Sequence, residues 1–76
     1  MKTRIENCLK KAGLPEIPDS PQQNLSDWGL DSLVMVKSLV EFENEFNLRI
    51  TAEEFSEEAF ESLDALEKYL QSLGAQ

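Results

Sequence analysis

The stretch Asp27-Trp28-Gly29-Leu30-Asp31-Ser32-Leu33-Val34-Met35-Val36, DWGLDSLVMV, places a glycine and an Asp-Ser pair directly before an apolar run. Asp and Ser are favoured at helix N-termini, where their side chains accept hydrogen bonds from free backbone N–H groups. By position alone, Ser32 is expected to be such a cap. The same position also allows a second role, because a hydroxyl in the first turn can project outward and hold a phosphate near the positive end of the helix dipole.

The residues that follow predict a helix over 32–46. Four apolar residues at spacings of 4, 3 and 4 share one narrow sector and form the predicted core face: Met35, Leu39, Phe42 and Phe46. Leu33, Val34 and Val40 fall outside this sector, and Leu33, Lys37 and Val40 form a row beside the start of the helix. Two interpretations of these surplus apolar residues stay open: neighbouring helices bury them, or they form a docking patch.

A first helix is predicted over residues 3–12. Thr3 and Glu6 have capping-box spacing, and Gly13 supplies a stop. The apolar face of this helix consists of Ile5, Cys8, Leu9 and Ala12. On that face Cys8 is interpreted as a small core residue in preference to a reactive thiol.

Residues 14–31 cannot form a continuous helix, because three prolines recur at intervals of three. The segment is predicted to be a stiff extended connection held to the core by its apolar residues, which are Leu14, Ile17, Leu25, Trp28 and Leu30. A long ordered loop in so short a chain often has a function.

Two further helical segments are predicted near the C-terminus. Thr51 and Glu54 match a capping box that opens a short acidic helix over 53–60. Ser62 can cap a last helix over 62–73, in which leucines recur on one face before Gly74 ends it. With no alternating strand pattern, the fold class is all-α, in a single domain over residues 1–76.

Composition excludes several classes of function. The 15 acidic and 7 basic side chains give a net charge of −8, which argues against nucleic acid and anionic membranes and favours basic partners. The absence of histidine removes the Ser-His-Asp arrangement and most zinc sites, so we expect neither an enzyme nor a metal site. A single cysteine, no leader-like apolar segment and no membrane-length run predict a cytoplasmic protein, expected to be a monomer.

The motif GLDSL, at residues 29–33, and the order of helices resemble acyl carrier proteins and the related aminoacyl and peptidyl carriers. The resemblance extends through EFENEF, Ile50-Thr51 and the closing SLDALEKYL. It implies a four-helix bundle of three main helices and a short third helix, with a long loop between helices 1 and 2. It also implies that Ser32 is esterified by 4′-phosphopantetheine from coenzyme A, whose thiol then holds an acyl or aminoacyl group.

The resemblance further implies which partners the chain meets. They are a phosphopantetheinyl transferase, an acyl- or aminoacyl-loading ligase, and synthase or transferase enzymes with basic docking surfaces. The residues implied in their recognition lie on the second helix and the short third helix: Asp31, Leu33, Val34, Lys37, Val40, Glu41, Glu53 and Glu54.

Two residues depart from the pattern of fatty-acid-synthesis carriers, which are commonly acidic where this chain has Val34 and Lys37. Asp31 before Ser32 favours an acyl carrier over many peptidyl carriers, in which histidine is frequent there. We therefore expect a discrete acyl carrier of a specialised fatty-acid, polyketide or modified-lipid pathway. The alternatives are an aminoacyl or peptidyl carrier of a nonribosomal-peptide-like system and, from another class, an unmodified acidic helical adaptor.

Overall fold

The computed structural model describes residues 2–51 and 53–75. Its helical elements, in chain order, are α1 (Lys2–Ala12), the 3-10 helix η1 (Leu25–Trp28), α2 (Ser32–Phe46), the 3-10 helix η2 (Glu57–Glu61) and α3 (Leu63–Ser72). These described ranges contain no β-strand, which confirms the all-α prediction. Within them, no helix has both the length and the apolar character required to cross a membrane.

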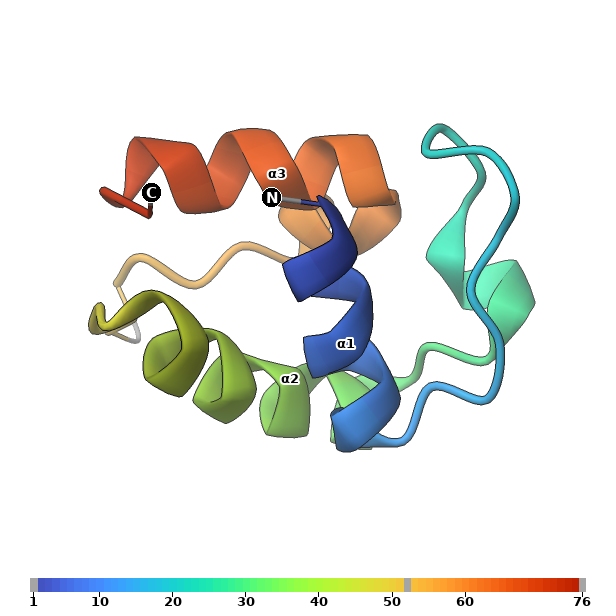
Figure 1. The fold of residues 1–76 in the computed structure, drawn as a ribbon, viewed down its shortest axis with the longest axis horizontal. Helices are drawn as coiled ribbons and strands as arrows, with labels where there is room; N and C mark the ends of the chain where they lie inside the picture. The colour runs from blue at the N-terminus through green and yellow to red at the C-terminus, as the bar shows by residue number, and fades with distance from the viewer. Residues whose placement is uncertain (1, 52, 76) are drawn as a thin grey trace.

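Helix α1 lies across the other two α-helices and packs on both (Figure 1). Its buried face is the predicted one, with Ile5, Cys8, Leu9 and Ala12 all inside the core. The largest side chains with almost no exposed surface come from all three helices and both 3-10 segments: Ile5, Leu9, Leu25, Phe42, Phe60, Leu66 and Leu70. One core therefore joins the whole described chain.

A row of aromatic rings runs through this core. Phe42 lies between Phe46 and Phe60, with ring centroids 6.3 and 6.2 Å away, and Phe60 continues to Phe55 at 6.1 Å. These separations suit tilted aromatic pairs. At the end of the row, the Arg4 guanidinium lies 4.5 Å from the centre of the Phe46 ring, which joins α1 to the end of α2.

The helices end in one recurring way. Each of four helical segments is followed by a residue with positive φ, and the next residue donates its N–H to a carbonyl five positions earlier: Leu14 to Leu9, Leu30 to Leu25, Leu48 to Glu43, and Ala75 to Leu70. This is the Schellman arrangement, in which an apolar residue after the turn packs back on the helix. The predicted helix stops at Gly13 and Gly74 are confirmed.

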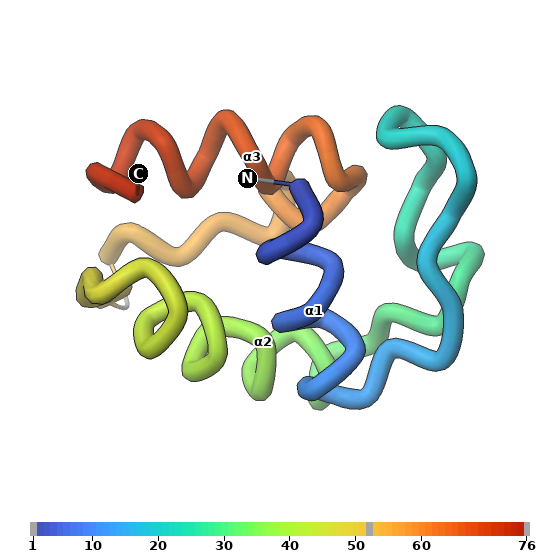
Figure 2. The backbone as a smooth tube through the Cα atoms, viewed as in Figure 1, coloured from blue at the N-terminus to red at the C-terminus, as the bar shows by residue number. Residues whose placement is uncertain are grey.

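The connection between α1 and α2 follows one edge of the molecule and returns (Figure 2). It is not simply extended, because Asn24 caps η1 by accepting a hydrogen bond from the Ser26 N–H at 3.0 Å. Leu25 and Leu30 anchor it in the core, whereas Trp28, a predicted anchor, is only half-buried. A bond of 3.0 Å from the Asp64 N–H to the Pro21 carbonyl ties its far side to α3.

Two predicted helix starts are corrected by the structure. Helix α1 begins at Lys2, so Thr3 lies inside it and is not its cap. The predicted helix over 53–60 is wrong: residues 53 and 54 form a turn, and only η2 is helical. Phe55 and Phe60 explain the break, since residues five apart on one α-helix point about 140° apart and these two rings touch.

The core face of α2 is rotated from the predicted sector. Its buried residues are Val34, Ser38, Phe42 and Phe46, while Met35 and Leu39 are only half-buried. Helix α1 packs on α2, and Gly13 at its end lies on the Val34 side, where a Cβ would be 3.7 Å from the Val34 Cγ2; this packing accounts for the rotation. Ser38 is accommodated there by donating its hydroxyl proton to the Met35 carbonyl at 2.7 Å.

We predict that Gly29→Ala destabilises the fold more than Gly74→Ala. Both glycines have φ near 100°, which costs an alanine about 1–2 kcal/mol. A Cβ at Gly29 would also lie 2.9 Å from two ring carbons of Pro15, whereas one at Gly74 meets nothing within 4 Å. Urea unfolding should therefore show an additional loss of about 1–3 kcal/mol at Gly29, and equal losses would contradict the Pro15 contact.

Candidate functional site

The start of α2 is capped by Asp31. This residue has extended backbone, and its Oδ1 accepts a hydrogen bond of 2.9 Å from the Val34 N–H. Its carbonyl accepts the N–H of Met35, also at 2.9 Å, which is the first turn of the helix. The position-based expectation that Ser32 is the cap is therefore wrong.

Ser32 is the first residue inside α2 and is exposed. Among the residues that the structure describes, its hydroxyl has no hydrogen-bond partner. Because Asp31 satisfies the helix end, Ser32 is not needed for capping. Its Oγ is therefore available for a covalent bond at the positive end of a fifteen-residue helix.

The backbone before Ser32 is held firmly. Leu25 and Leu30 are both buried and are joined by a hydrogen bond of 3.2 Å between the Leu30 N–H and the Leu25 carbonyl. Gly29, between them, has φ 103° and passes against Pro15 too closely for a side chain. The hydroxyl is thus exposed on a rigid support rather than on a mobile loop.

The structure separates the predicted recognition residues into two groups. Asp31, Leu33, Lys37 and Val40 are exposed and Glu41 is half-buried, all on or beside α2. Glu53 and Glu54 are exposed in the turn before η2. Val34 does not belong with them: it is 8% exposed and packs toward Gly13, so it cannot contact a partner directly.

The sequence prediction omits Val36, which the structure shows to be 58% exposed. It lies on the same side of α2 as Leu33 and Val40, which are 61% and 52% exposed. The spacing contained this signal, because Val36 and Val40 follow Leu33 by three and seven residues and therefore share its side of a helix.

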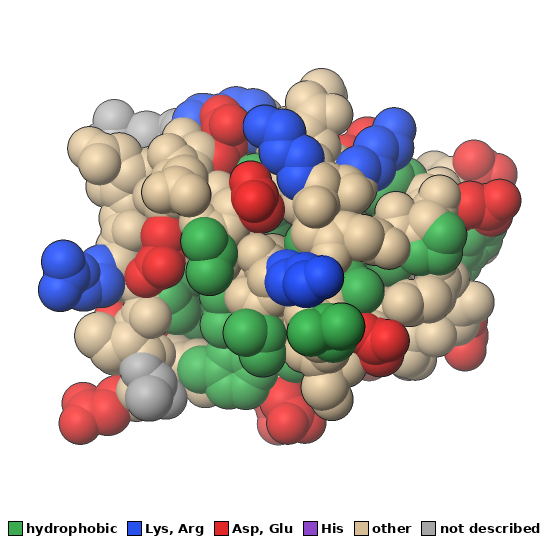
Figure 3. All heavy atoms as spheres, turned by 90° about the horizontal axis from the view of Figure 1, so that it is seen from below, with side chains coloured by type: hydrophobic (Ala, Val, Ile, Leu, Met, Phe, Trp, Pro, Cys, Tyr) green, Lys and Arg blue, Asp and Glu red, His purple; other side chains and the backbone are tan. Residues whose placement is uncertain are grey.

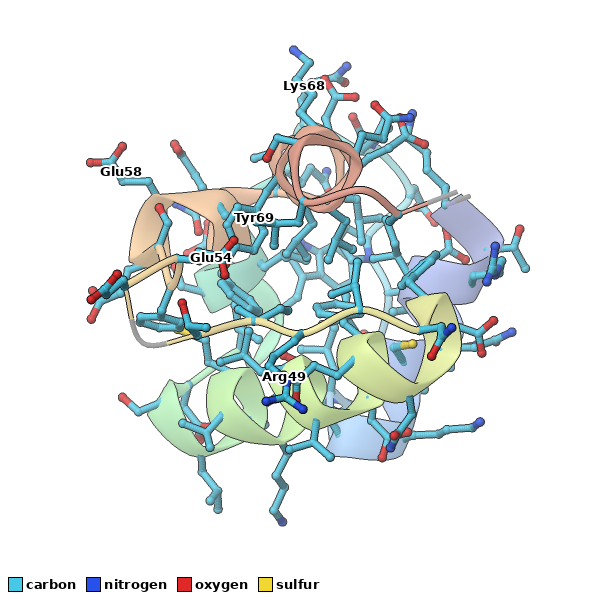
Figure 4. The ribbon with its side chains drawn as sticks, turned by 90° about the vertical axis from the view of Figure 1, so that its left-hand side faces the viewer. Arg49, Glu54, Glu58, Lys68 and Tyr69 are labelled. Carbon is cyan, nitrogen blue, oxygen red and sulfur yellow. The ribbon has the colours of Figure 1, made fainter. Side chains whose placement is uncertain are left out.

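The segment after α2 is fastened at two points. The Glu43 carboxylate accepts the Ile50 N–H at 2.8 Å, and the Tyr69 hydroxyl donates to the Glu54 carbonyl at 2.7 Å (Figure 4). Burial, and next the Glu54 carboxylate, raise the pKa of Tyr69, so it stays protonated as this donor near neutral pH. The Glu54 carboxylate folds back to accept the Thr51 hydroxyl at 3.1 Å.

An open apolar groove of about 290 Å³ lies between α2 and this segment. It is lined by Val36, Leu39, Ile50, Thr51 and Phe55. Val36 follows Ser32 by four residues, about one helical turn and about 6 Å along the axis. A second hollow, of about 370 Å³, is polar and lies at the other end of α2, beside Arg4, Glu45 and Asn47.

The Cys8 thiol is not activated for chemistry in the structure. Cys8 is 3% exposed, and burial, reinforced by Glu45 and Glu41, raises its pKa to about 11. Its thiol is thus a core group, as predicted.

Throughout residues 2–51 and 53–75, acidic and sulfur side chains form no group of three or more that could hold a metal ion.

A family model described as a phosphopantetheine attachment site matches residues 4–70. The chain belongs to this phosphopantetheine-binding family. Such domains are non-catalytic carriers, and their cofactor is covalently attached 4′-phosphopantetheine. This carrier therefore interacts with a phosphopantetheinyl transferase and with synthase enzymes. No significantly similar sequence was found among curated proteins.

We predict unequal effects on stability from two adjacent substitutions in the carrier. Asp31→Ala removes the bond to the Val34 N–H and should cost about 1 kcal/mol. Ser32→Ala removes a hydroxyl without a partner among the described residues and should change stability by less than about 0.5 kcal/mol. Urea unfolding of the two variants measures both values, and a larger loss for Ser32→Ala would restore that residue as the cap.

Proposed function

We propose that Ser32 is the residue to which 4′-phosphopantetheine is attached, through an ester between its Oγ and the phosphate. The exposed, unbonded hydroxyl at the start of α2 carries this proposal, since it lies within the matched residues 4–70 and follows the GLD sequence. When attached, the group supplies a terminal thiol that holds acyl groups as thioesters.

The residues around Ser32 fit such a group. Its exposed neighbours within α2, Leu33 and Val36, carry no charge, and the carboxylate of the preceding Asp31 accepts the Val34 N–H. The first-turn N–H groups and the helix dipole favour a negative group at this end. Since Asp31 already occupies the cap position, attachment at Ser32 requires no capping bond to break.

We further propose that the cargo is an acyl group of a specialised fatty-acid, polyketide or modified-lipid pathway. The apolar groove beside Val36 and Phe55 supports an apolar cargo, because each methylene that it covers would contribute about 0.8 kcal/mol. The basic Lys37, which is exposed on α2, supports a partner set different from that of housekeeping fatty-acid synthesis. A monomeric, cytoplasmic carrier domain over residues 1–76 remains our proposal for its form and location.

Intact-protein mass spectrometry tests the attachment site. The chain, incubated with coenzyme A, magnesium and a permissive phosphopantetheinyl transferase, should gain one pantetheine adduct. Ser32→Ala should gain none, whereas Ser26→Ala, which removes another exposed serine at a helical turn, should be modified like the wild type. An adduct on Ser32→Ala would overturn the assignment.

Thermal unfolding of loaded carriers tests the cargo. The carrier holding a medium-chain acyl group should unfold at a higher temperature than the same carrier holding an alanyl group, because only the acyl chain can cover the groove. Val36→Ser should reduce this difference, and Val40→Ser, outside the groove lining, should leave it unchanged. Preferential loading by an amino-acid ligase, with no higher unfolding temperature for the acyl-loaded carrier, would favour the aminoacyl alternative.

A further inference from the structure

Aromatic rings close the apolar groove beside α2 toward the interior of the molecule. Phe55 joins the two features, because it lines the groove and its ring centroid lies 6.1 Å from that of Phe60. Phe60 and Phe42, the next rings in the row, have almost no exposed surface. A ligand that follows the groove inward therefore meets the Phe55 ring and, behind it, the packed core.

The other end of the groove lies close to the proposed attachment site. Figure 3, seen from the side of α2, shows hydrophobic side chains gathered on this face of the molecule, with Asp and Glu side chains around them. Val36, which lines the groove, follows Ser32 by four residues, or about 6 Å along the helix axis. The groove therefore begins within about one helical turn of the hydroxyl that would carry the cargo.

The outer wall of the groove is fastened and resists widening. This wall is the segment after α2, which returns alongside that helix (Figure 4). Its Ile50 N–H donates to the Glu43 carboxylate at 2.8 Å, and its Glu54 carbonyl accepts the Tyr69 hydroxyl at 2.7 Å. Widening the groove would break at least one of these bonds, so we expect its volume to stay near 290 Å³.

This volume limits the length of acyl chain that the groove can cover. A space of about 290 Å³ holds about ten groups of the size of a water molecule, at about 30 Å³ each. A methylene group is of about this size. The groove can therefore cover a saturated chain of up to about ten carbons, provided that the Phe55 ring stays in place.

We propose that Phe55 determines the length of acyl chain that this carrier can shield from water, because its ring separates the groove from the core. This inference rests on the proposed function of Ser32. Carbons up to the limit are covered by Val36, Leu39 and Ile50, whereas further carbons remain in water. The cargo thus lies on the surface of the helical core and does not enter it.

Thermal unfolding of the loaded carrier against chain length tests this limit. The full chain is loaded at Ser32 from acyl-coenzyme A, with magnesium and a permissive phosphopantetheinyl transferase, using saturated acyl groups of increasing length. The unfolding temperature should rise with chain length up to about ten carbons and then stay constant. A temperature that keeps rising with the longest chains would show that the chain enters the core, and would overturn the proposal.

Two matched substitutions at opposite ends of the aromatic row locate the limit. Phe55→Leu makes a smaller side chain in the groove, and Phe46→Leu makes the same change beside Arg4, outside the groove lining. Because the cargo can fill the space left at residue 55, Phe55→Leu should extend the limit by about two to three carbons. Phe46→Leu should lower the unfolding temperature at every chain length and leave the limit unchanged.

A bulkier residue at the same position should have the opposite effect. Phe55→Trp fills part of the groove and should shorten the limit by about two carbons. This variant leaves no cavity, so it tests the proposal even if Phe55→Leu does not fold, which circular dichroism would reveal. An unchanged limit in folded Phe55→Trp would contradict the role of Phe55.

The outcomes separate this inference from the proposed function. If mass spectrometry finds no acyl-pantetheine adduct on the wild type, or finds one on Ser32→Ala, the proposed function and this inference are both overturned. With the adduct on Ser32, an unfolding temperature independent of chain length would overturn this inference together with the acyl cargo. An equal limit in wild type, Phe55→Leu and Phe46→Leu would overturn this inference alone, whereas a limit that moves only with residue 55 supports it.

Discussion

The buried pair Leu25 and Leu30 determines where the rest of the site lies. Their side chains enter the core from the two sides of Gly29, and the Leu30 N–H closes the turn on the Leu25 carbonyl. Asp31 follows immediately and caps α2, so Ser32 is held two residues from a fully packed position. The turn needs a glycine, because φ is 103° and Pro15 occupies the space of a side chain.

This arrangement gives α2 two different tasks on opposite sides. Its inner side places Phe42 between the rings of Phe46 and Phe60 and makes the helix part of the core. Its outer side leaves Leu33 and Val40 exposed, which contributes nothing to the stability of the isolated chain and favours association. A carrier that visits several enzymes needs this combination, since the modified residue must be rigidly held while the surface around it remains free.

The charge distribution suits brief and selective contacts. Most carboxylates of the chain are exposed, and the ion pairs among the described residues are on the surface, where each adds little to stability. The net charge of −8 can therefore act on partners rather than within the fold.

The sequence by itself determined the elements whose signals are local. The bounds of α2, the Ser62 cap of α3 and the helix stops at Gly13 and Gly74 all depend on hydrogen bonds within a few residues. Only the tertiary structure decided which neighbour buries which side: Gly13, at the end of α1, lies against Val34, and the contact of Phe55 with Phe60 interrupts the expected helix over 53–60. Of the predicted loop anchors, Leu25 is fully buried whereas Trp28 is only half-buried. Asp31, rather than Ser32, became the cap for a similar reason, since the packed turn at Leu30 sets the register in which the helix begins. Local hydrogen bonding can be read along the chain, whereas packing depends on residues that are distant in sequence.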